Sequence, residues 1–107
     1  MNKYRDKSDF EINKAVAVNI NGTDAVLEKF GRIYISDGDR GAMVSFSPCN
    51  NPADAMPIIN EYGISLIYQE GEFQFATNDG NIECSISNPL KAAMIIFLMM
   101  KDAENES

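Results

Sequence analysis

The fold is decided by one stretch of sequence, NPLKAAMIIFLMMK, which spans residues 88–101. Asn88 is a favoured N-cap residue, and Pro89 suits the first helical position, where no amide hydrogen is needed. Before the final lysine of the stretch, only Lys91 is charged. A helix that is apolar all round must be buried, and this one is too short to cross a bilayer, which needs about 20 apolar residues. We therefore predict a central core helix at residues 89–101, with the rest of the chain wrapped around it.

The length and composition indicate one globular domain. A chain of 107 residues forms a single domain, 1–107, and its charged ends at residues 1–7 and 102–107 are expected to fray. Hydrophobic residues make up 45% and charged residues 23% of the chain, as in ordinary globular proteins. The charged N-terminus lacks the apolar segment of a signal peptide. Two cysteines, Cys49 and Cys84, are too few for a disulfide framework. We expect a cytoplasmic protein.

The net charge of −7 is unevenly distributed along the chain. Residues 1–50 hold seven basic and seven acidic side chains, whereas residues 51–107 hold two basic and nine acidic ones. Such a surface repels phosphates, so we expect no direct binding of nucleic acid. The acidic second half either attracts a basic protein partner or simply keeps the protein soluble. The candidate partner-binding residues are Asp54, Glu61, Glu70, Glu72, Asp79 and Glu83.

A first helix is predicted at residues 9–19. Ser8 and Glu11 fit a capping box, and the pair Asn21-Gly22 stops the helix. One apolar stripe at helical spacing would pack on the domain; its members are Ile12, Ala15, Val16 and Ile20. The first turn is acidic, so this helix has no basic amphipathic face for a membrane.

The next region, residues 25–47, is typical of strands. Residues 32–35 and 42–46 are rich in β-branched and aromatic side chains, and turn-forming residues separate them at 36–41. Asp37 and Asp39 suggest a calcium loop, but the further oxygen ligands and the closing glutamate of an EF-hand are missing. The segment is therefore predicted to be a hairpin turn, with no metal site.

A second helix is predicted at residues 53–62, with Asn51 as its cap, Pro52 at its start and Gly63 at its end. Pro57 lies inside this helix, where a proline removes one backbone hydrogen bond, so a kink or a boundary is expected there. Four residues are predicted to point inward, namely Ala55, Met56, Ile58 and Ile59.

Cys49 lies just before this second helix, where the thiol pKa can fall. A cysteine nucleophile usually needs a histidine base, and the chain contains no histidine. We therefore predict that Cys49 is a small buried apolar residue rather than a catalytic one.

Three further strands are predicted at residues 64–69, 73–77 and 82–86, separated by turns of glutamate, asparagine, aspartate and glycine. They form an antiparallel meander with one apolar face, which the core helix covers. That face comprises Ile64, Leu66, Tyr68, Phe73, Phe75, Ile82, Cys84 and Ile86. The predicted fold class is α+β, an antiparallel sheet covered by helices.

Three blocks of the sequence resemble a family of small tailed-phage and prophage proteins that includes NinX, from the nin region of lambdoid phages. The blocks are SDFEINKAVA, CNNPADAMPII and NPLKAAMIIFLMM, and the resemblance extends over residues 8–101. The family usually has tryptophan where this chain has Met56, and another aromatic site corresponds to Phe75. The resemblance implies a helix–sheet–helix sandwich and a phage accessory protein made in the bacterial cytoplasm. It supplies no catalytic residue and no cofactor.

Three functions from different classes are compatible with the sequence. The first, which we prefer, is a non-enzymatic module that binds a host or phage protein. Through its acidic second half it would inhibit or modulate a host or defence factor that binds nucleic acid, in one version by mimicking nucleic acid in the basic groove of that factor. The second is a homodimeric structural or assembly protein in which Met94, Met99 and Met100 adapt to an interface. The third is an enzyme with paired carboxylates, either Asp37 with Asp39 or Glu70 with Glu72; we rank it last because solvated carboxylates make poor general acids and bases at neutral pH.

Overall fold

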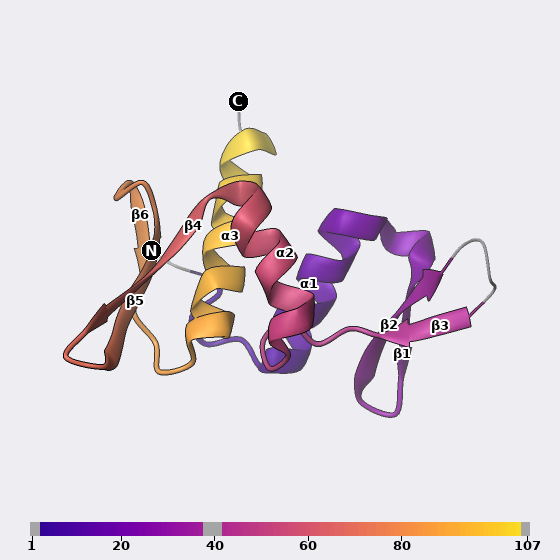
Figure 1. Ribbon diagram of the computed structural model, residues 1–107. Helices are drawn as coiled ribbons and strands as arrows, with labels where there is room; N and C mark the ends of the chain where they lie inside the picture. Colours follow the sequence, from indigo (N-terminus) through magenta and orange to yellow (C-terminus); the bar gives the residue numbers. More distant parts are fainter. Residues whose placement is uncertain (1–2, 38–41, 106–107) are drawn as a thin grey trace.

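Three helices lie in the middle of the molecule, with a three-stranded antiparallel sheet on either side (Figure 1). The computed structural model describes residues 3–37 and 42–105. The elements are α1 (Asp9–Asn21), the short 3₁₀ helix η1 (Thr23–Ala25), β1 (Val26–Lys29), β2 (Arg32–Asp37), β3 (Ala42–Ser45), α2 (Pro52–Tyr62), β4 (Ile64–Gln69), β5 (Glu72–Asn78), β6 (Ile82–Cys84) and α3 (Pro89–Asn105).

The predicted α+β fold class is confirmed, but the layers have a different order from the one that the resemblance implied. A helix–sheet–helix sandwich would place one sheet between helices. Here β1–β3 form an N-terminal sheet, β4–β6 form a separate C-terminal sheet, and the helices lie between them (Figure 1).

Helix α3 is the core element, as predicted. All side chains of residues 92–98 are buried, and α3 contacts α1, α2 and each strand of the C-terminal sheet. It continues to Asn105, beyond the predicted end. We expected frayed ends, yet Tyr4 is buried and its hydroxyl donates to Asp102 Oδ2 at 2.6 Å. Part of each terminus is therefore packed on the domain.

One irregularity in the C-terminal sheet changes which side chains face α3. Ile67 pairs with Phe75 but Tyr68 pairs with Phe73, so Gln74 has no partner in β4. One extra residue reverses the alternation along β5. Phe73 therefore packs against the core, whereas Phe75 lies on the other face, and the prediction for Phe75 was wrong.

Tyr68 shares the apolar face with its partner Phe73, as predicted, but it is 54% exposed rather than buried. Its ring lies near the hairpin end of the sheet and packs edge-on against Phe73, with ring centroids 5.5 Å apart. The remaining predicted members of the face are buried or packed against the core, namely Ile64, Leu66, Phe73, Ile82, Cys84 and Ile86.

The N-terminal sheet packs on α1 through one face. Ile33 is buried, and Val26 and Ile35 pack against the core. Leu27 pairs with Tyr34, so these two side chains share the opposite face. The predicted turn at 36–41 falls largely outside the described residues: Asp37 ends β2, whereas Asp39 is not described.

The signals for both early helices are confirmed, but one apolar residue in each is exposed. Ser8 Oγ accepts a hydrogen bond from the Glu11 amide at 3.1 Å, and the Ser8 amide donates back to Glu11 Oε1. Ile20 is nevertheless 44% exposed, because the buried stripe continues through Ala17 instead.

Helix α2 begins after its predicted cap, since Asn51 Oδ1 accepts from the Ala53 amide at 3.0 Å. It ends at Gly63, whose φ of 64° is the left-handed conformation that glycine adopts without strain. Met56 is exposed rather than inward-facing, and the helix passes through Pro57 as one element. The buried side of α2, which consists of Ala55, Ile58 and Ile59, packs against α3.

Candidate functional site

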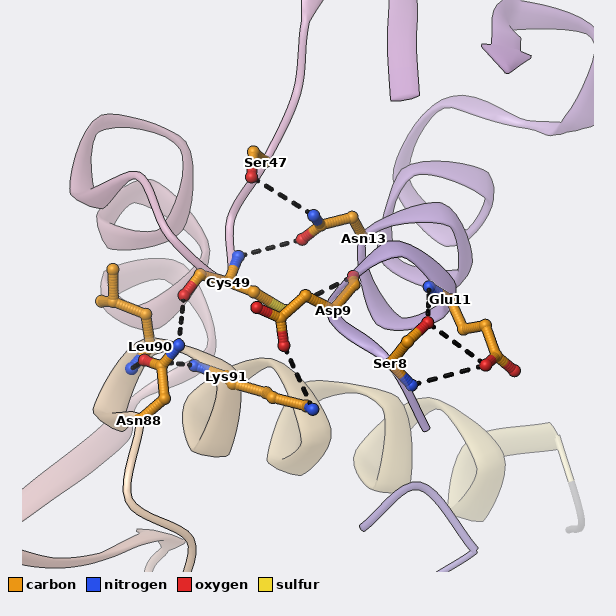
Figure 2. A network of polar contacts seen from close by, with 9 residues as sticks. All are labelled: Ser8, Asp9, Glu11, Asn13, Ser47, Cys49, Asn88, Leu90 and Lys91. Carbon is orange, nitrogen blue, oxygen red and sulfur yellow. Dashed lines mark hydrogen bonds and ion pairs between the residues drawn. The ribbon is translucent and has the colours of Figure 1, made fainter. Parts of the chain in front are cut away.

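The starts of the three helices meet in a network of polar contacts, which we call the helix-start junction (Figure 2). Asn13 of α1 is nearly fully buried. Its Nδ2 donates to Ser47 Oγ at 3.3 Å, and its Oδ1 accepts from the Cys49 amide at 3.0 Å. A single amide side chain thus ties α1 to the loop between β3 and α2.

Asn88 links α3 to the same loop between β3 and α2. Its Oδ1 accepts from the amides of Leu90 and Lys91, and its Nδ2 donates to the Cys49 carbonyl at 2.7 Å. Lys91 also forms an ion pair with Asp9 at 3.1 Å. Each of the three sequence blocks that carry the family resemblance supplies a residue to this junction, namely Asn13, Cys49 and Asn88. The three blocks therefore meet at one place in the fold, where the helices pack together.

Cys49 lies inside the junction, where its chemistry is suppressed. The thiol is fully buried, and burial, assisted by the charge of Asp9, raises its pKa to about 12. A thiol with such a pKa stays protonated at neutral pH and is a poor nucleophile. The prediction of a buried apolar residue is confirmed.

The six predicted partner-binding carboxylates do not form one cluster. Asp54 is half-buried and accepts from the Ser47 amide at 2.9 Å, so its role is structural. The other five are exposed, and none forms an ion pair with a described basic side chain. Glu70 and Glu72 lie at one end of the C-terminal sheet and Asp79 lies at the other, roughly 20 Å away along β5.

An apolar groove of about 310 Å³ lies between the C-terminal part of α3 and the β5–β6 turn, which carries Asp79. Tyr62 forms one wall, and its ring packs edge-on against Phe97 with centroids 4.9 Å apart. Lys101 Nζ lies 4.8 Å from the same ring. The groove is lined by Tyr62, Asn78, Asn81, Ile82, Met99, Met100, Ala103 and Glu104. Of the three methionines that the homodimer hypothesis assigned to an interface, Met99 and Met100 line this groove. Met94 is fully buried inside the subunit, so its assignment was wrong.

The outer face of the N-terminal sheet is the surface that sequence reasoning missed. It exposes Leu27, Met43 and the turn residue Phe30. The available signal was the tetrapeptide Lys29-Phe30-Gly31-Arg32, in which a residue followed by glycine makes a tight turn between two strands.

Within residues 3–37 and 42–105, no group of three or more histidine, cysteine, aspartate or glutamate side chains is arranged to hold a metal ion. In the same part of the chain, no helix has both the length and the apolar character needed to cross a membrane.

Comparison with known proteins identifies a family that the chain resembles over most of its length. The family model described as "Bacteriophage P22, NinX" matches residues 3–101. Searches of curated proteins and of solved structures found no significant match. Because the family model covers nearly the whole described domain, including all three helix starts, this chain belongs to the phage P22 NinX family.

Proposed function

We propose that this protein is a phage accessory protein that works in the bacterial cytoplasm, without catalysis, by binding a basic surface of another protein. The single observation that carries the proposal is a set of exposed carboxylates in the second half of the chain that form no ion pair with a described basic side chain. They are Glu61, Glu70, Glu72, Asp79 and Glu83.

The distribution of these carboxylates suits a partner with an extended basic groove. Because the acidic residues sit at both ends of the C-terminal sheet, they present negative charge over a length of roughly 20 Å rather than at a point. Phosphates along a nucleic acid are spaced in the same extended manner. A host or phage factor that binds nucleic acid would therefore be attracted to this surface, at a rate that falls with ionic strength.

The same features argue against the enzyme hypothesis. The one thiol near helix starts is buried and protonated. Glu70 and Glu72, the paired carboxylates suggested by the sequence, are exposed at a hairpin end, where solvent surrounds them. Of the other suggested pair, Asp37 ends β2 and Asp39 lies outside the described residues.

The test is capture of host-cell proteins on the immobilised chain at low and raised salt. We expect a basic protein to be retained at low salt and released at raised salt. The double variant E70Q/E72Q should lose this protein. The matched control is D6N/D24N, which removes two exposed charges from the first half without breaking an ion pair.

Three outcomes would overturn the proposal. The first is the absence of any salt-sensitive partner at low salt. The second is equal loss of the partner from both double variants, because then only net charge, and not the C-terminal sheet, governs capture. The third is direct binding of duplex DNA by the purified chain.

The homodimer hypothesis is favoured by one observation, the apolar groove beside the end of α3. A second copy would cover Met99 and Met100, which are only half-buried. Light scattering at micromolar concentration distinguishes the two functions. A monomer removes the homodimer, and a dimer that dissociates in M100E establishes it.

A further inference from the structure

The outer face of the N-terminal sheet is apolar and uncovered. Among the described residues, three of the seven exposed large hydrophobic side chains lie on this face or at its turn, namely Leu27, Phe30 and Met43. A fourth, Val44, pairs with Ile35 and lies on the side of α1. Leu27 pairs with Tyr34, and Met43 pairs with Ser36 two positions further along β2. Their side chains therefore point to the side away from α1. Such clustering marks interaction sites on soluble proteins.

These side chains surround a hollow of about 270 Å³. Its lining consists of Leu27, Lys29, Phe30, Tyr34 and Met43. The hollow has an aromatic wall, an aliphatic floor and one cation, which is the composition of a pocket for a large apolar side chain rather than for a polar group.

Phe30 holds an unfavourable backbone conformation at the edge of this hollow. Its φ is 54°, in the left-handed region, which costs a residue other than glycine about 1–2 kcal/mol. The side chain is 87% exposed, so burial within the chain does not offset this cost. Asparagine, aspartate and glycine suit such turns far better. Strain of this kind persists where function requires the side chain.

Two positive charges without a described carboxylate partner lie at the same turn. Lys29 and Arg32 face each other across the two strands, an arrangement that repulsion destabilises. Neither forms an ion pair with a described carboxylate, whereas the five other lysines that the structure describes all do. Glu28, their neighbour on β1, points to the other side and pairs with Lys14.

We propose that this outer face docks an acidic polypeptide segment of a partner protein, placing one large apolar side chain in the hollow beside Phe30 and its carboxylates on Lys29 and Arg32. The segment supplies the two things that the face lacks, an apolar cover and negative charge. This site is distinct from the acidic surface proposed above, and it selects the opposite kind of partner.

Two other occupants fit the surface less well. A second copy related by twofold symmetry would bring the same two cations together without a carboxylate between them. A single-stranded nucleic acid could stack on Phe30 and Tyr34, but it carries a phosphate at every nucleotide. Among the described residues, this face offers only Lys29 and Arg32 to neutralise them, and the net charge of −7 repels the remaining phosphates.

The test is selection of short random peptides against the immobilised full chain, followed by affinity measurement on one synthesised, fluorescent peptide. Enriched peptides should carry a large apolar residue next to aspartate or glutamate. Phe30→Asn should weaken the peptide at least about tenfold, because it removes the aromatic wall. Lys29→Glu should weaken it similarly and shift selection towards basic peptides.

Glu70→Asn is the matched control, since Glu70 holds the same position before a glycine in the β4–β5 hairpin. It should leave the affinity within about twofold of the native value. Phe30→Asn relieves the strained turn, so its loss of binding cannot be explained by failure to fold.

Four outcomes would overturn the proposal. They are a selection that enriches no peptide or only basic peptides, equal recovery of peptides by Phe30→Asn, binding of an oligothymidylate that Phe30→Asn abolishes, and a dimer that Phe30→Asn dissociates. The variant E70Q/E72Q should not affect this binding, so the two proposed surfaces fail or succeed independently.

Discussion

Two hairpin turns, one in each sheet, share a backbone conformation and differ in chemistry. The β1–β2 turn places Phe30 at a φ of 54° before Gly31, and the β4–β5 turn places Glu70 at a φ of 55° before Gly71. The first is flanked by a lysine and an arginine, and the second by a glutamine and a glutamate. The same local geometry thus presents an aromatic ring between cations on one side of the molecule and carboxylates on the other.

The two sheets also differ in how firmly they are held. Helix α3 contacts every strand of the C-terminal sheet, whereas α1 supports the N-terminal sheet mainly through β1 and β2. Regions with few buried contacts open at a lower free energy than the core. The apolar outer face therefore lies on the sheet with the weaker support. A partner bound there would stabilise the N-terminal sheet against local opening more than it could stabilise the C-terminal sheet.

The largest effect is expected from shortening the centre of α3. Phe97 is fully buried and touches Tyr62, so Phe97→Ala should lower the free energy of unfolding by about 3–5 kcal/mol. Urea denaturation measures this change. Tyr68→Ala removes an exposed aromatic ring from the same side of the molecule and should cost far less. Similar losses in the two variants would show that α3 is not the core of the domain.

The central place of α3 was predictable because its helix cap and its apolar run are both local features of the sequence, which can be recognised without knowing the neighbouring elements. The caps at Ser8 and Asn51 were predictable for the same reason. Other features depend on packing between distant elements. The exposure of Ile20 and Met56 follows from the direction in which each helix meets its neighbours, and the reversal at Phe75 follows from one unpaired residue in β5.

The helix-start junction is expected to give the next largest effect. Asn88→Ala removes both the cap of α3 and the donor to the Cys49 carbonyl, and should cost about 2 kcal/mol. Asn51→Ala removes a cap from α2 alone and should cost about 1 kcal/mol.

Amide hydrogen exchange in β2 and β5 tests whether Asn88 couples the two sheets. Because the junction ties the loop after β3 to α3, Asn88→Ala should raise exchange in β2 as well as in β5, whereas Asn51→Ala should not do so in β2. Equal costs and equal exchange patterns for the two variants would contradict a coupling role for Asn88.

Replacing the two turn residues should stabilise the protein modestly. Phe30→Asn and Glu70→Asn each place a residue that tolerates the left-handed conformation, and each should raise the free energy of unfolding by about 1 kcal/mol. Thermal and urea denaturation measure the gain. A loss of stability in Phe30→Asn, but not in Glu70→Asn, would mean that the Phe30 ring packs on its own sheet instead of awaiting a partner.

The candidate sites were only partly predictable from the sequence. The excess of acid in the second half was visible in the residues alone. That Lys29 and Arg32 form no ion pair with a described carboxylate was not predictable, because ion pairing depends on which basic side chains the fold brings near a carboxylate. Asp54 illustrates the same limit, since its hydrogen bond to the Ser47 amide turned a candidate binding residue into a structural one.

The smallest effect concerns the capping box that starts α1, the helix supporting the N-terminal sheet. Hydrogen bonds from Ser8, aided by Lys7, lower the pKa of Glu11. A carboxyl group whose pKa is lower in the folded state adds stability above its unfolded pKa, about 4.5 here, and this stability is lost as pH falls through the folded pKa. Glu11→Gln removes this titrating group and should therefore flatten the dependence of stability on pH below about 4.5. A native-like pH dependence in Glu11→Gln would place the titrating group elsewhere, and the charge of Glu11 would then not contribute to the cap of α1.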